Sequence, residues 1–93
     1  MRFEWDDTKN RNNQSKHRVS FELASEVFAD PLHHSIAGGI ESGEQRWLTF
    51  GRVGGLVLLA VAHTWRDDAD QEVVRIISAR LATKKERRAY ESG

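Results

Sequence analysis

The run Leu56-Val57-Leu58-Leu59-Ala60-Val61-Ala62 is the longest apolar stretch of the chain, and it decides the fold. Its residues are apolar at both odd and even positions, which is typical of a strand covered on both faces. Seven residues are far fewer than the roughly 20 that cross a bilayer. The sequence therefore predicts a buried central strand over Leu56–Trp65 and no membrane span.

Further strand-like runs lie on both sides of this strand. They are joined by a glycine-rich loop through Gly38, Gly39 and Gly43, by the turn Val53-Gly54-Gly55, and by the polar loop Arg66–Gln71. Because these connections are short, we expect neighbouring strands to run antiparallel. The predicted strands are Leu32–Ala37, Arg46–Arg52 and Glu72–Arg80.

The N-terminal part of the chain predicts one more strand and two helices. Met1, Phe3 and Trp5 alternate with polar residues, which is the period of a half-buried strand. The polar segment Thr8–His17 has a capping start but almost no apolar stripe, so its helix would be marginal without tertiary support. A stronger helix begins after Ser20 and ends at Asp30-Pro31, and its apolar stripe must pack on a sheet.

The C-terminal part predicts a short basic helix. Thr83 and Glu86 form the S/T-x-x-E capping box, and the helix follows over Lys84–Ser92. Small residues are its only apolar anchors beside Leu81, so we expect it to be weakly tied to the core. The predicted fold is α+β, in the order βααββββα: an antiparallel sheet with two N-terminal helices packed on one face and a short C-terminal helix.

Length and composition restrict the class of protein. The 93 residues form one domain, residues 1–93, because so short a chain cannot bury two cores. Apolar residues make up 39% and charged residues 30%, which is the balance of a soluble globular domain. The start of the chain lacks a secretory apolar region and there is no cysteine, so we expect a cytoplasmic protein.

The net charge is zero, but the charges are unevenly distributed. Residues 1–20 carry five basic and three acidic groups, residues 21–74 carry three and nine, and residues 75–93 carry six and two. If folding brings the two basic ends to one face, that face would attract phosphates. Ordinary solvated faces explain the same pattern, so charge alone leaves the partner open.

Five stretches in this order resemble the BrnT family, toxins of bacterial type II toxin-antitoxin systems with a RelE-like ribonuclease fold. The resemblance covers nearly the whole chain. The family usually has glycine where this chain has Arg18, and glycine there would suit a left-handed residue ending the first helix. The matching stretches are Phe3–Asp6; Lys16–Glu22 through Val27–Pro31; Glu44–Trp47 with Gly51; Arg75–Arg80; and Ala82-Thr83 with Glu86-Arg87 and Tyr90-Glu91.

The resemblance implies a metal-independent endoribonuclease that cleaves RNA and inhibits translation and growth. It also implies neutralisation by a cognate ribbon-helix-helix antitoxin, similar to BrnA, through which the complex binds operator DNA. No cofactor and no metal ligand set is expected. Cleavage of RNA through its own 2′-hydroxyl needs a base, a proton donor for the leaving oxygen and cations for the charge on the phosphorane.

The candidate catalytic residues lie mainly near the C-terminus. Arg80 leaves the last strand, and its fork suits a phosphate, while a salt bridge to Glu86 or Glu91 is the structural alternative. Arg87 and Tyr90 share one helix face. Arg87 is a candidate RNA-binding residue or a solvated one; Tyr90 could donate a proton, stack on a base or pack in the core. Glu86 is a further candidate proton donor.

The histidines give a second set of candidates. His63 ends the central strand and is the best candidate acid or base among the histidines, although a partly buried histidine bonded to a backbone carbonyl explains it more simply. Whether it neighbours Arg75, a candidate RNA-binding residue, depends on the hairpin register. Lys16 and His17 are candidate RNA contacts, but they also suit a helix C-terminus. His33-His34 are consecutive and make a poor metal pair.

Two other functions stay open at this point. Trp47, Phe50 and Trp65 alternate with basic residues, so they could form a stacking platform of an RNA-binding module without turnover. Core packing explains these rings more simply. The acidic middle segment could instead be a docking surface of a protein-interaction module. Turnover of RNA separates the enzyme from both alternatives.

Overall fold

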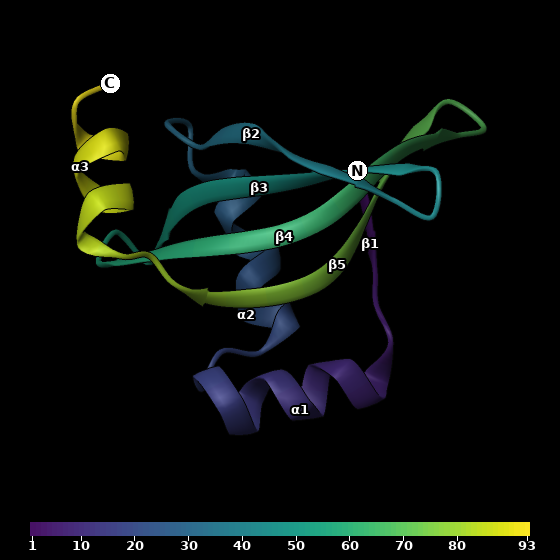
Figure 1. Ribbon diagram of the computed structural model, residues 1–93, viewed down its shortest axis with the longest axis horizontal. Helices are drawn as coiled ribbons and strands as arrows, with labels where there is room; N and C mark the ends of the chain where they lie inside the picture. Colours follow the sequence, from purple (N-terminus) through teal and green to yellow (C-terminus); the bar gives the residue numbers. More distant parts are fainter.

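A computed structural model describes residues 1–93 and shows an α+β domain built on one five-stranded sheet (Figure 1). The sheet order is β1-β5-β4-β3-β2, so β4 is central, and its residues 58–61 are all buried, as predicted. No helix of the protein is long and apolar enough to cross a membrane. The elements are β1 (Arg2–Glu4), α1 (Asp7–His17), α2 (Phe21–Ser25), the 3₁₀ helix η1 (Glu26–Ala29), β2 (His34–Glu41), β3 (Glu44–Val53), β4 (Val57–Asp68), β5 (Gln71–Leu81) and α3 (Lys84–Glu91).

The sheet is mixed, and the prediction of an antiparallel sheet was wrong at one edge. The strands β2 to β5 pair antiparallel, but β1 pairs parallel to β5, with Phe3 opposite Val74. Short connections force antiparallel pairing only between strands that follow one another on the chain. The strand β1 is separated from β5 by most of the domain, and parallel pairing needs such a long connection.

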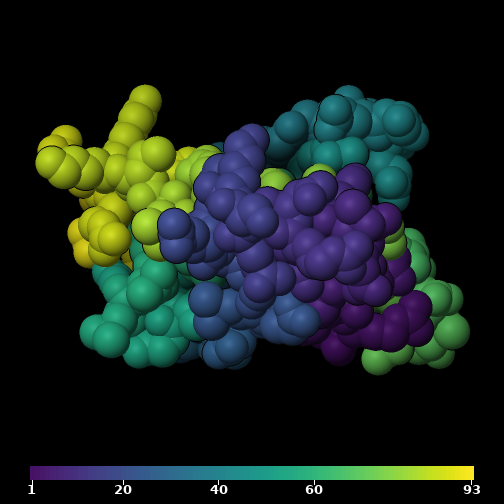
Figure 2. Space-filling model, turned by 90° about the horizontal axis from the view of Figure 1, so that it is seen from below, coloured from purple at the N-terminus to yellow at the C-terminus, as the bar shows by residue number.

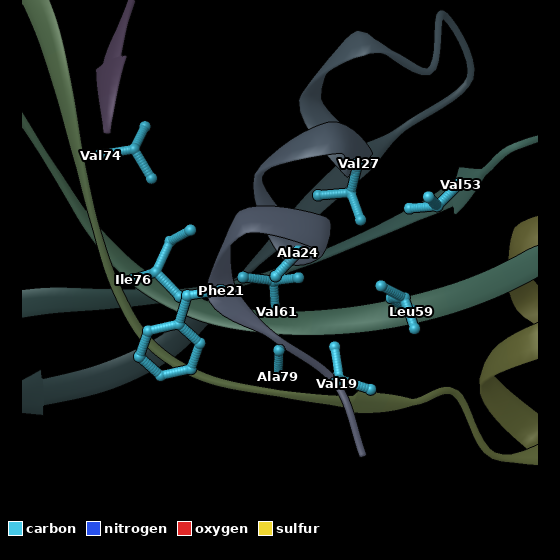
Figure 3. Close-up of a cluster of buried hydrophobic side chains, with 10 residues drawn as sticks. All are labelled: Val19, Phe21, Ala24, Val27, Val53, Leu59, Val61, Val74, Ile76 and Ala79. Carbon is cyan, nitrogen blue, oxygen red and sulfur yellow. The ribbon is translucent and has the colours of Figure 1, made fainter. Parts of the chain in front are cut away.

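The helices α1 and α2, with η1, cover one face of the sheet (Figure 1). Seen from that side, α1 and the segment after it lie over the middle of the molecule (Figure 2). The main core lies beneath α2 and η1, where Phe21, Ala24 and Val27 meet Leu59 and Val61 of β4 (Figure 3). This helical layer leaves the opposite face of the sheet available for α3.

Gly51 on β3 allows the close approach of η1. A Cβ atom at this position would lie 2.7 Å from the carbonyl oxygen of Val27 and 2.8 Å from its Cβ. These distances are too short for any side chain, so only glycine fits between β3 and η1. The sequence predicted one helix up to Asp30, whereas the last turn tightens into the separate η1, as helix ends often do.

The helix α1 ends at a residue with left-handed backbone. Arg18 has φ 60° and ψ 28°, and its N–H donates to the Gln14 carbonyl oxygen at 2.9 Å. Arg18 therefore adopts the conformation that a glycine would adopt at lower cost, by about 1 kcal/mol. The left-handed turn that ends α1 therefore forms even though its residue is arginine rather than glycine.

Two predicted loops are wrong, because the strands extend further than expected. The strand β2 continues through Gly38 and Gly39, where the register shifts, and turns only at Ser42-Gly43. The polar segment Arg66–Gln71 mostly belongs to β4 and β5, and only Ala69 and Asp70 form the turn, both with positive φ. Polar residues at an exposed hairpin pair by their backbone without an apolar pattern to reveal it.

The helix α3 packs on the other face of the sheet, at one end (Figure 1). Side chains alternate along a strand, so Phe50 and Ala60 face away from Leu59 and Val61. They form a smaller hydrophobic cluster with Leu58 of β4 and Tyr90 of α3. The predicted capping box is confirmed: the Thr83 hydroxyl accepts from the Glu86 N–H, and the Glu86 carboxylate accepts from the Thr83 N–H.

Candidate active site

The junction of β5 and α3 brings Arg80 and Glu86 together. Arg80 Nη1 and Nη2 donate to the two carboxylate oxygens of Glu86 at 2.7 and 3.0 Å. The guanidinium, together with the Thr83 N–H, lowers the pKa of Glu86 to about 2 although partial burial opposes this. Glu86 is therefore a fixed carboxylate at neutral pH, and it holds Arg80 in place.

Arg80 keeps donors that Glu86 does not use. A guanidinium has five N–H groups, and the structure gives three of them to Glu86 and the Leu81 carbonyl. The two that remain, on Nε and Nη2, lie on one edge of the group, and the side chain is 38% exposed. Arg80 can therefore hold Glu86 on one edge and bind a phosphate on the other.

A row of directly paired residues runs across the sheet beside α3. Arg80 pairs with Ala60, Ala60 with Phe50, and Phe50 with His34. Paired residues lie on the same face of a sheet, so all four point toward the α3 side. The His34 ring lies 5.4 Å from that of Phe50 and 5.9 Å from that of Tyr90, with which it is stacked at 20°.

Tyr90 anchors α3 to the segment before β2. Its side chain is buried, and its hydroxyl donates to Asp30 Oδ2 at 2.5 Å. Burial is the main cause that raises the pKa of Tyr90, and the hydrogen bond to the Asp30 carboxylate raises it as well. Burial tends to raise the pKa of Asp30. The hydrogen bonds from the Arg52 N–H, the Tyr90 hydroxyl and the Leu32 N–H outweigh it, so the pKa of Asp30 is lowered. The hydroxyl proton is thus already committed to Asp30.

Two hollows lie beside this row, and both are lined by His34 and Ala89. The smaller, of about 370 Å³, is also lined by Lys85 and Glu86. The larger, of about 730 Å³, lies on the side of Tyr90 and Arg52. His34 therefore borders both hollows, and it shares the smaller one with Lys85 of α3.

His63, the predicted acid or base, lies in the core. It is fully buried, with Nε2 2.6 Å from the Thr49 hydroxyl and Nδ1 3.0 Å from the Thr64 carbonyl oxygen. A carbonyl only accepts, so Nδ1 carries the proton and Thr49 donates to Nε2, in a chain that begins at the Ser35 hydroxyl. Burial lowers the pKa of His63, and the bond to Thr64 opposes this. The geometry gives this ring a structural task, and its catalytic role stays a prediction.

The register settles the relation between His63 and Arg75. A shift between Ala62 and His63 places Ile76 opposite His63, so Arg75 instead pairs with Thr64. The Arg75 side chain lies 3.5 Å from Glu4, which also pairs with Arg66. We call the group of Arg80 and Glu86 at the β5–α3 junction, with Tyr90 and the stacked His34 beside them, the α3 corner. Arg75 lies five residues from Arg80 along β5, or about 16 Å, and pairs with Glu4, so it is not part of this corner.

The remaining candidates for RNA contact divide between the two faces of the sheet. Arg87 lies on α3, partly exposed and three residues before Tyr90. Lys16 and His17 form the last turn of α1, toward the same end of the molecule as α3 but on the opposite side of the sheet (Figure 1). The structure therefore brings Arg80, Glu86, Arg87 and Tyr90 together, and it leaves Lys16, His17, His63 and Arg75 elsewhere.

Sequence reasoning missed His34, Asp30 and Arg52 at this corner. His33-His34 were considered only as a metal pair, and Asp30 only as part of a helix end. The signal for His34 was its place on a predicted strand, but its neighbours depend on the register with β3, which no sequence pattern fixes. No group of three or more histidine, cysteine, aspartate or glutamate side chains has the arrangement of a metal site.

The aromatic residues considered as a stacking platform do not form one surface. Phe50 is buried in the smaller cluster beneath α3, and Trp65 is 37% exposed on β4. Trp47 pairs with His63 and therefore lies on the face opposite Phe50. This arrangement agrees with the simpler explanation by packing.

Comparison with known proteins assigns the class. The family model described as the ribonuclease toxin BrnT of type II toxin-antitoxin systems matches residues 5–86. The crystal structure of the Brucella abortus ribonuclease toxin BrnT is similar to the chain, with a TM-score of 0.64 and 25% sequence identity over 90% of this chain and 99% of that one. No curated protein sequence matches.

The fold and these matches define a ribonuclease toxin of the type II toxin-antitoxin class. The match to the family model spans most of the chain and includes the residues of the α3 corner up to Glu86. The chain belongs to the BrnT family.

Proposed function

We propose that the protein is a metal-independent endoribonuclease that cleaves RNA at the corner between β5 and α3. The observation that carries this proposal is the partly exposed Arg80 fork, held by Glu86 beside the hollow that Glu86 and Lys85 line. Arg80 would stabilise the charge that develops on the phosphorane, with Lys85 and Arg87 as further cations. Glu86 positions Arg80, and Tyr90 positions α3.

We further propose the biological setting that the family suggests. Cleavage of RNA in the cytoplasm would inhibit translation and growth, as expected for a toxin with a RelE-like fold. A cognate ribbon-helix-helix antitoxin, similar to BrnA, would neutralise the activity and carry the complex to operator DNA. The type II family supports an antitoxin partner and an RNA target.

The test is turnover of RNA by the purified protein, with RNA in large excess and EDTA present. We expect Arg80→Ala to lower the cleavage rate roughly a hundredfold, or about 2.7 kcal/mol of transition-state stabilisation. Arg80→Lys should also lose activity, because lysine keeps the charge but not the fork. The control is Arg11→Ala, which removes an exposed arginine of α1 and should leave the rate unchanged.

The circular-dichroism spectrum and melting temperature of each variant would be measured alongside. A folded Arg80→Ala protein that cleaves like the parent would exclude Arg80 from the site. Binding of RNA without any turnover would favour the alternative of a non-catalytic RNA-binding module. Loss of cleavage in EDTA that added Mg²⁺ restores would refute metal independence.

A further inference from the structure

The α3 corner lacks an obvious group to take the proton from the 2′-hydroxyl. Glu86 stays ionised and paired with Arg80, so it is a weak base. The Tyr90 hydroxyl is buried and bonded to Asp30, and its raised pKa opposes its use as a base. His63 is enclosed in the core with both ring nitrogens bonded. The proposed reaction therefore needs a further residue.

His34 has the position and the freedom that these groups lack. Its ring is stacked on the Tyr90 ring and lies against Phe50 at a tilt, so packing restricts its orientation. No protein group hydrogen-bonds its ring nitrogens, whereas Nδ1 of the neighbouring His33 lies 2.7 Å from the Asp30 carbonyl oxygen. Rings fixed by packing alone keep their nitrogens available to a ligand.

The surroundings of His34 suit a phosphodiester. It lines the hollow of about 370 Å³ together with Lys85, whose charge would attract a phosphate. Glu86 lines the same hollow, but Arg80 neutralises it. The charged and titratable groups on the elements around His34 are His33 and Asp30 before β2, Arg52 on β3, and Lys85, Glu86, Tyr90 and Glu91 on α3.

We propose that His34 is a catalytic residue that accepts the 2′-hydroxyl proton of an RNA strand bound in the hollow between β2 and α3. This inference rests on the proposed function and names the base of the same site. Histidine is the side chain that ordinarily exchanges a proton between pH 5 and 8. Stacking on Tyr90 couples its placement to α3.

The step conserves atoms and charge. The 2′-oxygen attacks phosphorus as its proton passes to a His34 ring nitrogen, and the O2′–P bond forms. The P–O5′ bond breaks, and the leaving O5′ takes a proton from water. The products are a 2′,3′-cyclic phosphate and a 5′-hydroxyl end, and the hydroxide left by the water takes the proton back from His34.

The test compares single-turnover cleavage of a 30-nucleotide single-stranded RNA of mixed sequence by the parent, His34→Ala and His34→Gln. We expect both variants to be slower by roughly a hundredfold, as for loss of a general base. The matched control is His33→Gln, which changes the adjacent imidazole and should stay within about threefold of the parent. Added imidazole should restore His34→Ala at least roughly tenfold, because the small base enters the vacated space.

The pH dependence separates proton transfer from packing. The rate of the parent should rise with pH as the base loses its proton, and His34→Gln should lose this rise. If the parent cleaves and a folded His34→Ala cleaves equally, the assignment is overturned while the proposed function stands. Loss of rate without imidazole rescue and with an unchanged pH profile also overturns it, because His34 would then only support Tyr90. A parent that does not cleave RNA refutes the proposed function itself.

Discussion

Two buried asparagines replace the apolar stripe that α1 lacks. Asn13 Nδ2 donates to the carbonyl oxygens of Val19 and Ala79 at 2.7 and 2.8 Å, and its Oδ1 accepts from the Ala79 N–H at 3.1 Å. Asn13 therefore pairs with β5 as a neighbouring strand would, beyond the point where β1 ends. Asn10 Oδ1 accepts from the Phe21 N–H, which fixes the start of α2. A polar helix is thus attached to the sheet by side-chain amides.

We expect Asn13→Ala to lower the free energy of unfolding by about 3 kcal/mol. The change leaves three buried backbone groups without partners, and each such group costs about 1–3 kcal/mol, partly relieved by water. Urea denaturation monitored by circular dichroism measures the difference. The matched control is Asn12→Ala on the exposed side of the same helix, which should change stability by less than about 0.5 kcal/mol.

A loss of less than about 1 kcal/mol in Asn13→Ala would contradict this account of α1. The helix α1 would then be held chiefly by contacts other than the hydrogen bonds of Asn13.

At the scale of elements, α3 is attached more firmly than its sequence indicated. The small residues beside Leu81 predicted a weakly tied helix, but Tyr90 is buried against Phe50 and Ala60 and bonds to Asp30. Arg52 lies over the Tyr90 ring at 5.4 Å and donates to Glu91 at 2.8 Å. The expectation of weak attachment was therefore wrong, because the largest anchor is the residue that was singled out for chemistry.

The start of α3 should contribute stability that depends on pH. The pKa of Glu86 lies at about 2, below its ordinary 4.5, so its ionised form stabilises the fold above pH 4.5. This contribution falls as the pH drops through the window from 4.5 to about 2. After allowance for the exposure of Arg80, it amounts to about 1–2 kcal/mol.

The measurement is urea denaturation of the parent and Glu86→Gln between pH 6 and pH 2. The parent should lose its advantage over the variant across that window, since glutamine does not titrate. Glu44→Gln, on an exposed glutamate with no bond to an arginine, serves as the control. A constant difference between parent and Glu86→Gln at every pH would show that the ion pair with Arg80 does not stabilise α3.

Local patterns predicted most elements, and non-local contacts account for what they missed. The buried β4, the capping box of α3 and the turn after Val53 follow from neighbouring residues alone. The parallel edge at β1, the shift beside His63 and the pairing of His34 with Phe50 join distant segments. The same holds for the site. The pairing of Arg80 with Glu86, six residues apart, was considered from the sequence, but the contact of His34 with Tyr90 was not.

At the scale of the molecule, the net charge is zero, but basic residues gather at one end and acidic residues at the other. The helix α3 with its lysines and arginines lies at one end of the long axis, and the tip of the β4–β5 hairpin at the other (Figure 1). Asp67, Asp68 and Asp70 are exposed at that tip. A polyanion should therefore bind at one end only, as the proposed site requires.

The salt dependence of RNA binding tests this polarity. For a 2′-deoxy oligonucleotide, which cannot be cleaved through a 2′-hydroxyl, we expect contacts to about three phosphates and a slope of log affinity against log salt near −2. The affinity should then fall roughly twentyfold between 50 and 200 mM salt. Combined Lys84→Ala and Lys85→Ala should reduce the slope by about 1.4, because two phosphate contacts are lost.

Combined Asp67→Asn and Asp70→Asn, at the far end, should leave the slope unchanged. A slope that responds to the hairpin and not to α3, or that Lys16→Ala on the opposite face reduces equally, would show that RNA does not enter at the α3 corner.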